Sequence, residues 1–193
     1  MKNRPVLAGS EKDGMKSYFM KMRGGGSTLP APGGTEILLG FIGSCVALYV
    51  VGLLHMLSMD ISGLPLIMAP FGASAVLVFG AFRSPLAQPR NVIGGHVLSA
   101  LVGITVYQFL GDNMIAAVSL AVPAAIALMH MTQTLHPPGG ATAFVTAAGG
   151  TAVHSLGYWY VLTPCLAGSV VLIAVALLVN NVPREHRYPQ FWF

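Results

Sequence analysis

Six apolar segments, separated by short polar or glycine- and proline-rich breaks, make up most of the chain after its first 35 residues. They cover about residues 36–58, 63–82, 92–110, 114–131, 138–150 and 157–182. An apolar helix of about 20 residues crosses a bilayer core of about 30 Å. The second segment contains Pro65 and Pro70, and the fifth is short, so we expect both to be broken or incomplete helices. The pattern predicts an all-α membrane protein.

Composition supports this interpretation. The 193 residues are 54% hydrophobic and only 8% charged, with a mean hydropathy of +0.71. A soluble domain carries roughly 25% charged residues, about three times as many, which argues against a soluble protein. Between Glu36 and Val182 the formally charged residues are Asp60, Arg83, Arg90 and Asp112.

The basic residues predict the topology. They gather in the N-terminal region (Lys2, Arg4, Lys12, Lys16, Lys21, Arg23) and after the last segment (Arg184, Arg187). Six crossings with both termini in the cytoplasm also place Arg83 and Arg90 inside, as the positive-inside rule requires. We therefore expect a flexible cytoplasmic tail at 1–34, a transmembrane domain at 35–182 and a second cytoplasmic tail at 183–193. No signal peptide is expected, because no long apolar run precedes Gly33.

A short sequence recurs in the second and fifth segments. Residues 70–75 and 138–143, 68 positions apart, share the pattern Pro-x-Gly-Ala-(Ser/Thr)-Ala. Each occurrence lies in the middle segment of a half with three segments, about 36–110 and 114–182. Three crossings per half invert the second half relative to the first, as in many secondary transporters. The sequence predicts a 3+3 inverted repeat, with a chance match in a glycine- and alanine-rich chain as the alternative.

The repeated pattern is suited to binding an anion. Proline begins a helix without loss, and small residues leave the first-turn N–H groups open to a ligand. Two opposed helix N-termini would hold a small monovalent anion without a buried cation. The alternative is a pair of kinked helices that only pack. The predicted substrate-binding residues are Pro70, Phe71, Gly72, Ala73, Ser74, His136, Pro137, Pro138, Gly139, Gly140, Ala141 and Thr142.

Other polar groups are candidates for supporting roles. His136 precedes two prolines and titrates near neutral pH, which suits an anion contact or a proton-coupling group. A structural histidine that fixes the break by a hydrogen bond is the alternative. His96 and His130, within or at the end of apolar segments, are further coupling candidates. Arg83, Arg90 and Asn91 would gather anions at the cytoplasmic mouth, or would only anchor the topology.

Other classes of function find little support. Cys45 and Cys165 lie in apolar segments, which argues against a disulfide framework, and no Cys-x-x-Cys pattern occurs. Met129-His130-Met131 leaves a metal-ion transporter as a weaker alternative. The apolar region has no catalytic motif, and the basic residues form no stripe with aromatic residues, as nucleic-acid binding would require. We expect no enzyme activity, cofactor, resident metal or nucleic-acid partner.

Several separated stretches of the chain resemble a known family. His136-Pro137-Pro138-Gly139-Gly140-Ala141-Thr142-Ala143 is similar to the signature of the HPP family of integral membrane proteins. Residues 70–75, residues 84–91 and Gly94-Gly95-His96 also resemble blocks of that family. The resemblance implies a membrane protein, usually described with four spans, and members of cyanobacteria and chloroplasts are associated with nitrite transport.

Together, the residues and the resemblance predict transport of a small monovalent anion, with nitrite the first candidate, across the bacterial inner membrane. A membrane accessory or sensor subunit that transports nothing is the alternative. The partners expected are an inorganic anion, the lipid bilayer and further copies of the same chain.

Overall fold

A computed structural model describes residues 11–22, 31–63, 65 and 67–193. The chain divides into two compact units, residues 1–32 and 33–193. In the first unit, α1 (Glu11–Lys21) is a helix. The flexible tail predicted for residues 1–34 falls largely on positions 1–10 and 23–30, which lie outside the described residues.

The second unit consists of helices, and the described residues contain no strand. The all-α prediction is therefore confirmed. Short π-helical turns (η1 and η3) and a 3-10 turn (η2) adjoin the α-helices. In chain order the elements are α2 (Gly34–Ser62), α3 (Pro70–Ala75), η1 (Val76–Gly80), η2 (Pro85–Ala87), α4 (Pro89–Leu110), α5 (Met114–Met131), α6 (Pro137–Ala148), α7 (Thr151–His154), η3 (Val161–Leu166) and α8 (Ala167–Val179).

Four helical segments are long and apolar enough to cross a membrane: residues 34–61, 89–110, 114–131 and 161–179. Between them lie two short helical segments, residues 70–80 and α6. These are the second and fifth apolar segments, so the prediction that both are broken or short is confirmed. The 3+3 inverted repeat stays a prediction, because length and composition identify four spans and not six.

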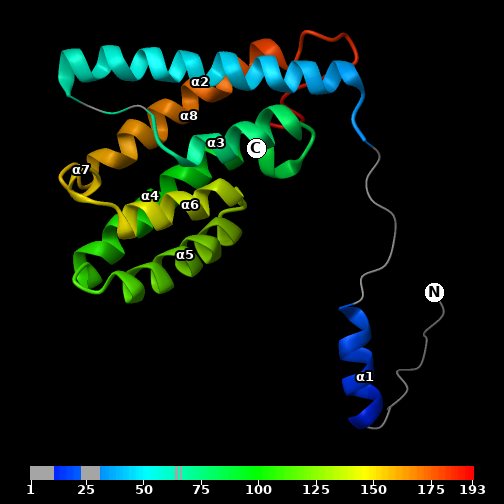
Figure 1. Ribbon diagram of the computed structural model, residues 1–193, viewed down its shortest axis with the longest axis vertical. Helices are drawn as coiled ribbons and strands as arrows, with labels where there is room; N and C mark the ends of the chain where they lie inside the picture. The colour runs from blue at the N-terminus through cyan, green and yellow to red at the C-terminus, as the bar shows by residue number, and fades with distance from the viewer. Residues whose placement is uncertain (1–10, 23–30, 64, 66) are drawn as a thin grey trace. The chain divides into compact units, whose positions relative to one another are not determined.

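The second unit has two ends with different chemistry. At the arginine end (Glu36, residues 78–90, 132–135 and 180–190), Arg83 Nη1 lies 2.7 Å from Glu36 Oε1, and Asn180 Nδ2 donates to the Val78 carbonyl. At the tyrosine end (Tyr107, His154 and Tyr158), the rings of Tyr107 and His154 stack at 3.3 Å. The chain passes back and forth between the ends, with α5 running opposite to α4 and α6 (Figure 1).

Small residues let the central helices approach closely. On α4, Gly95 and Gly103 face α6, where added Cβ atoms would meet the side chains of His136 and Thr146. On α5, the stripe Ala117, Ala121 and Ala125 is fully buried. Such stripes allow dense packing where lipid removes the hydrophobic force between helices. Both stripes therefore pack against other helices of the same chain.

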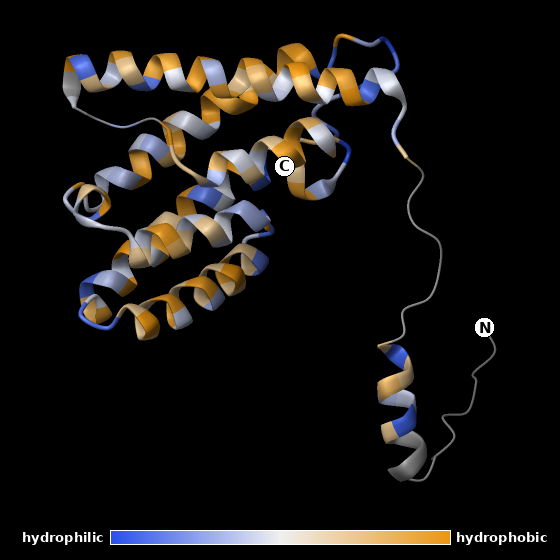
Figure 2. Cartoon of the chain, in the orientation of Figure 1, coloured by the Kyte–Doolittle hydropathy of each residue, from blue (hydrophilic) through white to orange (hydrophobic). Residues whose placement is uncertain are grey.

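Apolar side chains also cover the outside of the second unit. Figure 2 shows hydrophobic residues along most of α2, and many of them are exposed, among them Ile37, Phe41 and Tyr49. Since α2 is apolar all round, its uncovered face is suited to hydrocarbon rather than water.

The irregular backbone between the helices is held by side chains of neighbouring elements. Arg90 Nη2 donates to the Thr132 carbonyl at 2.8 Å, and Asn91 Nδ2 donates to the Leu135 carbonyl at 3.0 Å. Across the other break, the Thr163 hydroxyl donates to the Pro65 carbonyl. Broken backbone survives in a membrane only when the protein satisfies its polar groups. These three bonds satisfy two carbonyls of the break before α6 and one before α3.

Candidate functional site

Four polar side chains meet in the interior of the second unit. Ser74 lies on α3, His96 on α4, His136 immediately before α6 and Thr142 on α6; each is 0% exposed. We call these four residues the histidine cluster. Buried polar groups are costly in a membrane domain, and they commonly mark sites of function there.

Hydrogen bonds connect the whole cluster. Ser74 Oγ lies 2.7 Å from His96 Nε2 and 2.9 Å from His136 Nε2. The other nitrogen of His96, Nδ1, lies 2.7 Å from Thr142 Oγ1. His136 Nδ1 lies 2.8 Å from the backbone carbonyl of Leu86. All four ring nitrogens therefore have partners.

The direction of each bond follows from the Leu86 carbonyl, which has no proton to donate. With both rings neutral, His136 carries its proton on Nδ1 and accepts from the Ser74 hydroxyl at Nε2. Ser74 then accepts from His96 Nε2–H, and His96 Nδ1 accepts from the Thr142 hydroxyl. This assignment gives every donor in the cluster an acceptor.

Glycines and an aromatic ring position the histidines. A Cβ on Gly95 would lie 2.5 Å from His136 Cβ, and one on Gly139 would lie 2.8 Å from the Gly95 carbonyl oxygen. Both positions therefore require close approach of the α4 and α6 backbones. The Phe71 ring lies edge-on to the His96 ring, with centroids 5.4 Å apart. His96 is thus confined between α3 and α6.

The fold brings together part of the predicted binding set. Ser74, Thr142 and His136 meet through His96, which the sequence suggested only as a coupling group. Of the remaining residues, Phe71, Pro70, Pro138 and Gly139 are buried nearby in sequence, and Gly140 is half-buried. Exposed residues in this set are Gly72, Ala73, Pro137 and Ala141.

The sequence predicted that the first-turn N–H groups of the repeated pattern are open to a ligand. Three of these groups instead bond to backbone carbonyls. The N–H groups of Phe71 and Gly72 bond to the carbonyls of Met68 and Ala69, at 3.0 and 3.1 Å. The Gly139 N–H bonds to the His136 carbonyl at 2.7 Å. These first-turn groups are already satisfied by the preceding backbone, so the polar groups that face one another are side chains. Bonds to the Met68, Ala69 and His136 carbonyls were not predicted from the sequence.

Apart from His96 and His136, the predicted mouth and coupling residues lie away from the cluster. Arg83 is exposed and pairs with Glu36, while Arg90 and Asn91 hold the carbonyls of the break before α6. His130 is exposed at the end of α5. Of the cationic side chains suggested from the sequence, none belongs to the histidine cluster among the described residues.

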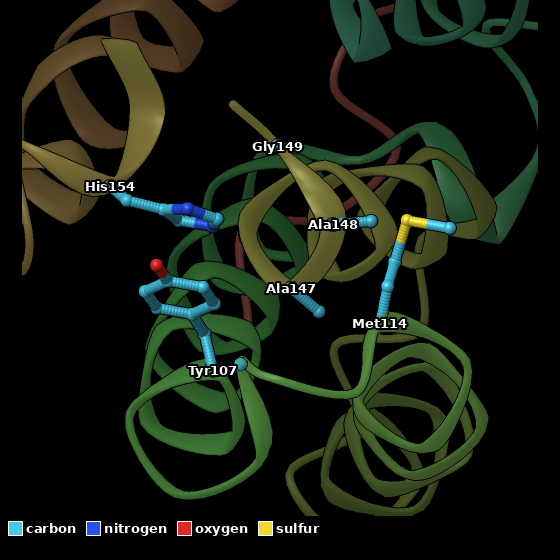
Figure 3. A pocket seen from close by; sticks show the side chains of 7 residues that line it. Tyr107, Met114, Ala147, Ala148, Gly149 and His154 are labelled. Carbon is cyan, nitrogen blue, oxygen red and sulfur yellow. The ribbon is translucent and has the colours of Figure 1, made fainter. Parts of the chain in front are cut away.

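A pocket of about 240 Å³ opens at the tyrosine end. Figure 3 shows Tyr107 and His154 on one side of it and Met114 on the other, with the end of α6 between them. His154 Nε2 lies 3.3 Å from the Thr146 carbonyl, and the Thr146 hydroxyl donates to the Thr142 carbonyl at 2.8 Å. Polar groups therefore continue along α6 from the cluster to this pocket. Neither the pocket nor the role of the Leu86 carbonyl was predicted from the sequence.

The described residues hold no group of three or more His, Cys, Asp or Glu side chains that could bind a metal ion. Cys165 is buried, and its sulfur lies 3.6 Å from the Met68 sulfur. Cys45 is exposed on α2.

The chain is similar in sequence to one protein family and to two transmembrane proteins. Residues 29–189 match the family described as HPP, transmembrane region. The chain is 38% identical over 181 residues to a transmembrane protein of Dictyostelium discoideum, covering 91% of this chain and 63% of the relative. A second transmembrane protein of that organism is 37% identical over 179 residues, covering 91% and 57%. The chain thus spans less than two thirds of either relative. No solved structure matches.

Proposed function

The chain belongs to the HPP transmembrane region family, and from that premise we propose that it carries a small monovalent anion across a membrane. The observation that supports this proposal is the histidine cluster, in which four buried polar side chains from three parts of the chain contact one another. A protein that only packs helices gains little from such a group, because apolar residues of similar volume pack without the cost of desolvation.

Nitrite is the first substrate we would test. The resemblance of residues 136–143 to the HPP signature implies it, and the chemistry of the cluster agrees. A site of hydroxyl and imidazole groups, without a permanently charged arginine or lysine, binds an anion weakly enough for it to leave again, as transport requires. We assign no catalytic reaction, resident cofactor or nucleic-acid partner to the chain.

The proposal includes a location. We place the protein in the inner membrane of a bacterium, with the arginine end and both termini in the cytoplasm and further copies of the chain beside it. The exposed arginines Arg83, Arg184 and Arg187 support this orientation through the positive-inside rule.

One observation favours a second candidate function, that of an accessory or sensor subunit without transport activity. The space between Ser74 and Thr142 is occupied by the His96 ring, and both hydroxyls bond to it. In this conformation no hydroxyl of the cluster is left for a ligand. Transport then requires His96 to move or to change its protonation, whereas a subunit without transport activity requires neither.

Flux into liposomes separates the two candidates. Purified protein is reconstituted, and nitrite uptake is measured with nitrate, formate and chloride as competitors. Transport predicts saturable nitrite uptake that exceeds the passive entry of nitrous acid into protein-free vesicles. Absence of saturable uptake of all four ions by folded protein, at pH 6 and at pH 8, would favour the accessory subunit.

A matched pair of variants connects the flux to the site. Thr142→Val removes the hydroxyl that donates to His96 and keeps the size of the side chain. Thr105→Val makes the same change at a half-buried position on α4, where the hydroxyl bonds to the Leu101 carbonyl and lies near the Tyr158 hydroxyl. We expect the first variant to lower uptake and the second to leave it unchanged.

A further inference from the structure

The hydrogen bonds of the neutral cluster are complete. Its four protons lie on the Thr142 hydroxyl, His96 Nε2, the Ser74 hydroxyl and His136 Nδ1, and each points to an acceptor within the chain. Because every donor is used, an anion that reaches the neutral cluster finds no free N–H or O–H group there. The neutral cluster therefore does not bind anions.

One added proton changes this balance. If His136 gains a proton at Nε2, that nitrogen becomes a donor to Ser74 and the Ser74 hydroxyl proton is released. If His96 gains a proton at Nδ1, the Thr142 hydroxyl proton is released in the same way. In either case the cluster acquires a positive charge. The released Ser74 hydroxyl is a free donor, whereas the released Thr142 hydroxyl also has the Pro138 carbonyl oxygen within reach, at 3.4 Å. Both changes favour an anion.

Few other charges lie near enough to compensate a buried anion. Of the described elements packed against the histidines, α3, α6, η2 and α8 carry no titratable side chain. On the others, Arg90 bonds to the Thr132 carbonyl, His130 on α5 is exposed, and η3 contributes buried Cys165 with Tyr160 at its start. Arg83 pairs with Glu36. An isolated charge in the interior is costly, so the counter-charge must arrive with the anion.

We propose that each anion crosses together with one proton, and that the histidine cluster binds both. The inference rests on the proposed transport function and adds its coupling: proton uptake by the histidine pair creates the anion site, and release of either ligand weakens binding of the other. No bond to the anion forms or breaks. The proton moves from water to an imidazole nitrogen and returns to water on the far side.

The surroundings of the cluster offer a route to each end of the second unit. The His136 Nδ1–H bond leads to Leu86, in the loop at the arginine end. From Thr142, the Thr146 hydroxyl and the His154 ring lead along α6 to the pocket at the tyrosine end. Backbone carbonyls accept these bonds but cannot pass on a proton, so exchange with water at either end requires the imidazole groups or water to bridge the gap.

The test measures charge and proton movement together. Proteoliposomes contain a pH-sensitive dye and K⁺ with valinomycin, which sets the membrane potential. On addition of nitrite we expect one proton to enter with each anion, at a rate independent of the imposed potential. Uptake in protein-free vesicles is subtracted, because nitrous acid also carries protons across lipid by diffusion.

Variants identify the groups that carry the proton. In His136→Asn the amide nitrogen can still donate to the Leu86 carbonyl, but the acceptor at Nε2 is lost. We expect nitrite uptake to fall about tenfold or more, the factor that corresponds to one hydrogen bond to a charged group. Ser74→Ala should behave alike, whereas Ser99→Ala, a buried serine on the neighbouring helix bonded only to the Met129 sulfur, should retain uptake.

Each outcome has a distinct meaning. Saturable uptake that charges the membrane and leaves the internal pH constant would overturn proton coupling while anion transport stands. Full uptake with unchanged proton coupling in folded His136→Asn and Ser74→Ala would show that the cluster only holds the helices together. Absence of uptake by folded wild-type protein would overturn the transport function, and the coupling with it.

Discussion

His96 connects the two helices that carry the repeated sequence pattern. Its Nε2 bonds to Ser74 on α3, and its Nδ1 bonds to Thr142 on α6. Loss of either hydroxyl leaves a ring nitrogen buried without a partner, which costs about 1–3 kcal/mol. The residue is therefore important to folding as well as to any ligand, and variants of its partners must be checked for stability.

The two glycines of the HPP sequence should respond differently to the same change. At Gly139 an added Cβ would lie 2.9 Å from Ser99 Oγ and 3.0 Å from Met129 Sδ, whereas at Gly140 nothing lies within 4 Å. We expect Gly139→Ala to destabilise the protein by about 1–3 kcal/mol through overpacking. Gly140→Ala should be neutral, or stabilising by about 1 kcal/mol, because alanine favours the helix. Thermal unfolding in detergent measures both, and equal melting temperatures would contradict this packing.

The sequence revealed most of the cluster but not its connections. Ser74 and Thr142 were predicted because they share one position of the repeated pattern, and His136 because it precedes the second copy. Their partner His96 lies in an ordinary apolar helix, and contacts between residues so far apart in the sequence leave no local pattern. The Leu86 carbonyl has no side-chain signature at all, so sequence could not have identified it.

At the scale of elements, the breaks before α3 and α6 connect neighbouring helices through side-chain hydrogen bonds. The segments before α3 and α6 expose carbonyls that no helix satisfies, and side chains from α4 and η3 bond to them. Proline patterns predicted where the breaks occur. They did not predict that the backbone before α3 would satisfy the first N–H groups of that helix, because this depends on how the extended segment turns.

Arg90 is expected to stabilise the break before α6. Arg90→Gln shortens the side chain and removes the charged donor to the Thr132 carbonyl, which should cost about 1.5–3 kcal/mol. Arg187→Gln, at an exposed position after α8, should cost less than about 0.5 kcal/mol. Comparison of the two melting curves checks this. A similar small effect for both would return Arg90 to the role of a surface charge.

Helix α2 contacts the rest of the unit through glycine positions. A Cβ on Gly43 would lie 2.5 Å from Phe79 Cδ1 and 3.1 Å from Val179 Cγ1, while Gly52 on the same helix has nothing within 4 Å. Gly43→Val should therefore displace α2 from η1 and α8 and lower the melting temperature, and Gly52→Val should not. Limited proteolysis of both variants would report the displacement. Equal resistance would show that α2 packs in another way.

At the scale of the whole molecule, the two ends define an orientation in the bilayer. The residues after α8 fold back on the arginine end, where the buried Tyr188 hydroxyl donates to the Ala87 carbonyl at 2.8 Å. Burial raises the pKa of Tyr188 above its ordinary range, which favours the protonated hydroxyl that donates this bond. The last segment and the loop before α4 are thus expected on the same side of the membrane.

Cysteine labelling tests this orientation. With Cys45 and Cys165 replaced by alanine, Glu185→Cys and Asp112→Cys each introduce one exposed thiol at opposite ends of the second unit. In intact bacteria an impermeant maleimide should label Asp112→Cys, and label Glu185→Cys only after the membrane is opened. Labelling of both thiols from outside would contradict the alternating path of the chain.

The close approach of α4 and α6 also constrains how the sequence of such proteins can diverge. A Cβ on Gly94 would meet the Thr134 side chain at 2.7 Å, and one on Gly95 would meet His136 Cβ at 2.5 Å. The segments Gly94-Gly95-His96 and Thr134-Leu135-His136 therefore constrain one another's residues, although they lie far apart in the sequence. Position 95 must stay glycine beside any residue at 136 that has a Cβ, whereas loss of the Thr134 methyl group removes the nearest contact at position 94. Substitutions at these positions should accordingly be correlated in descent.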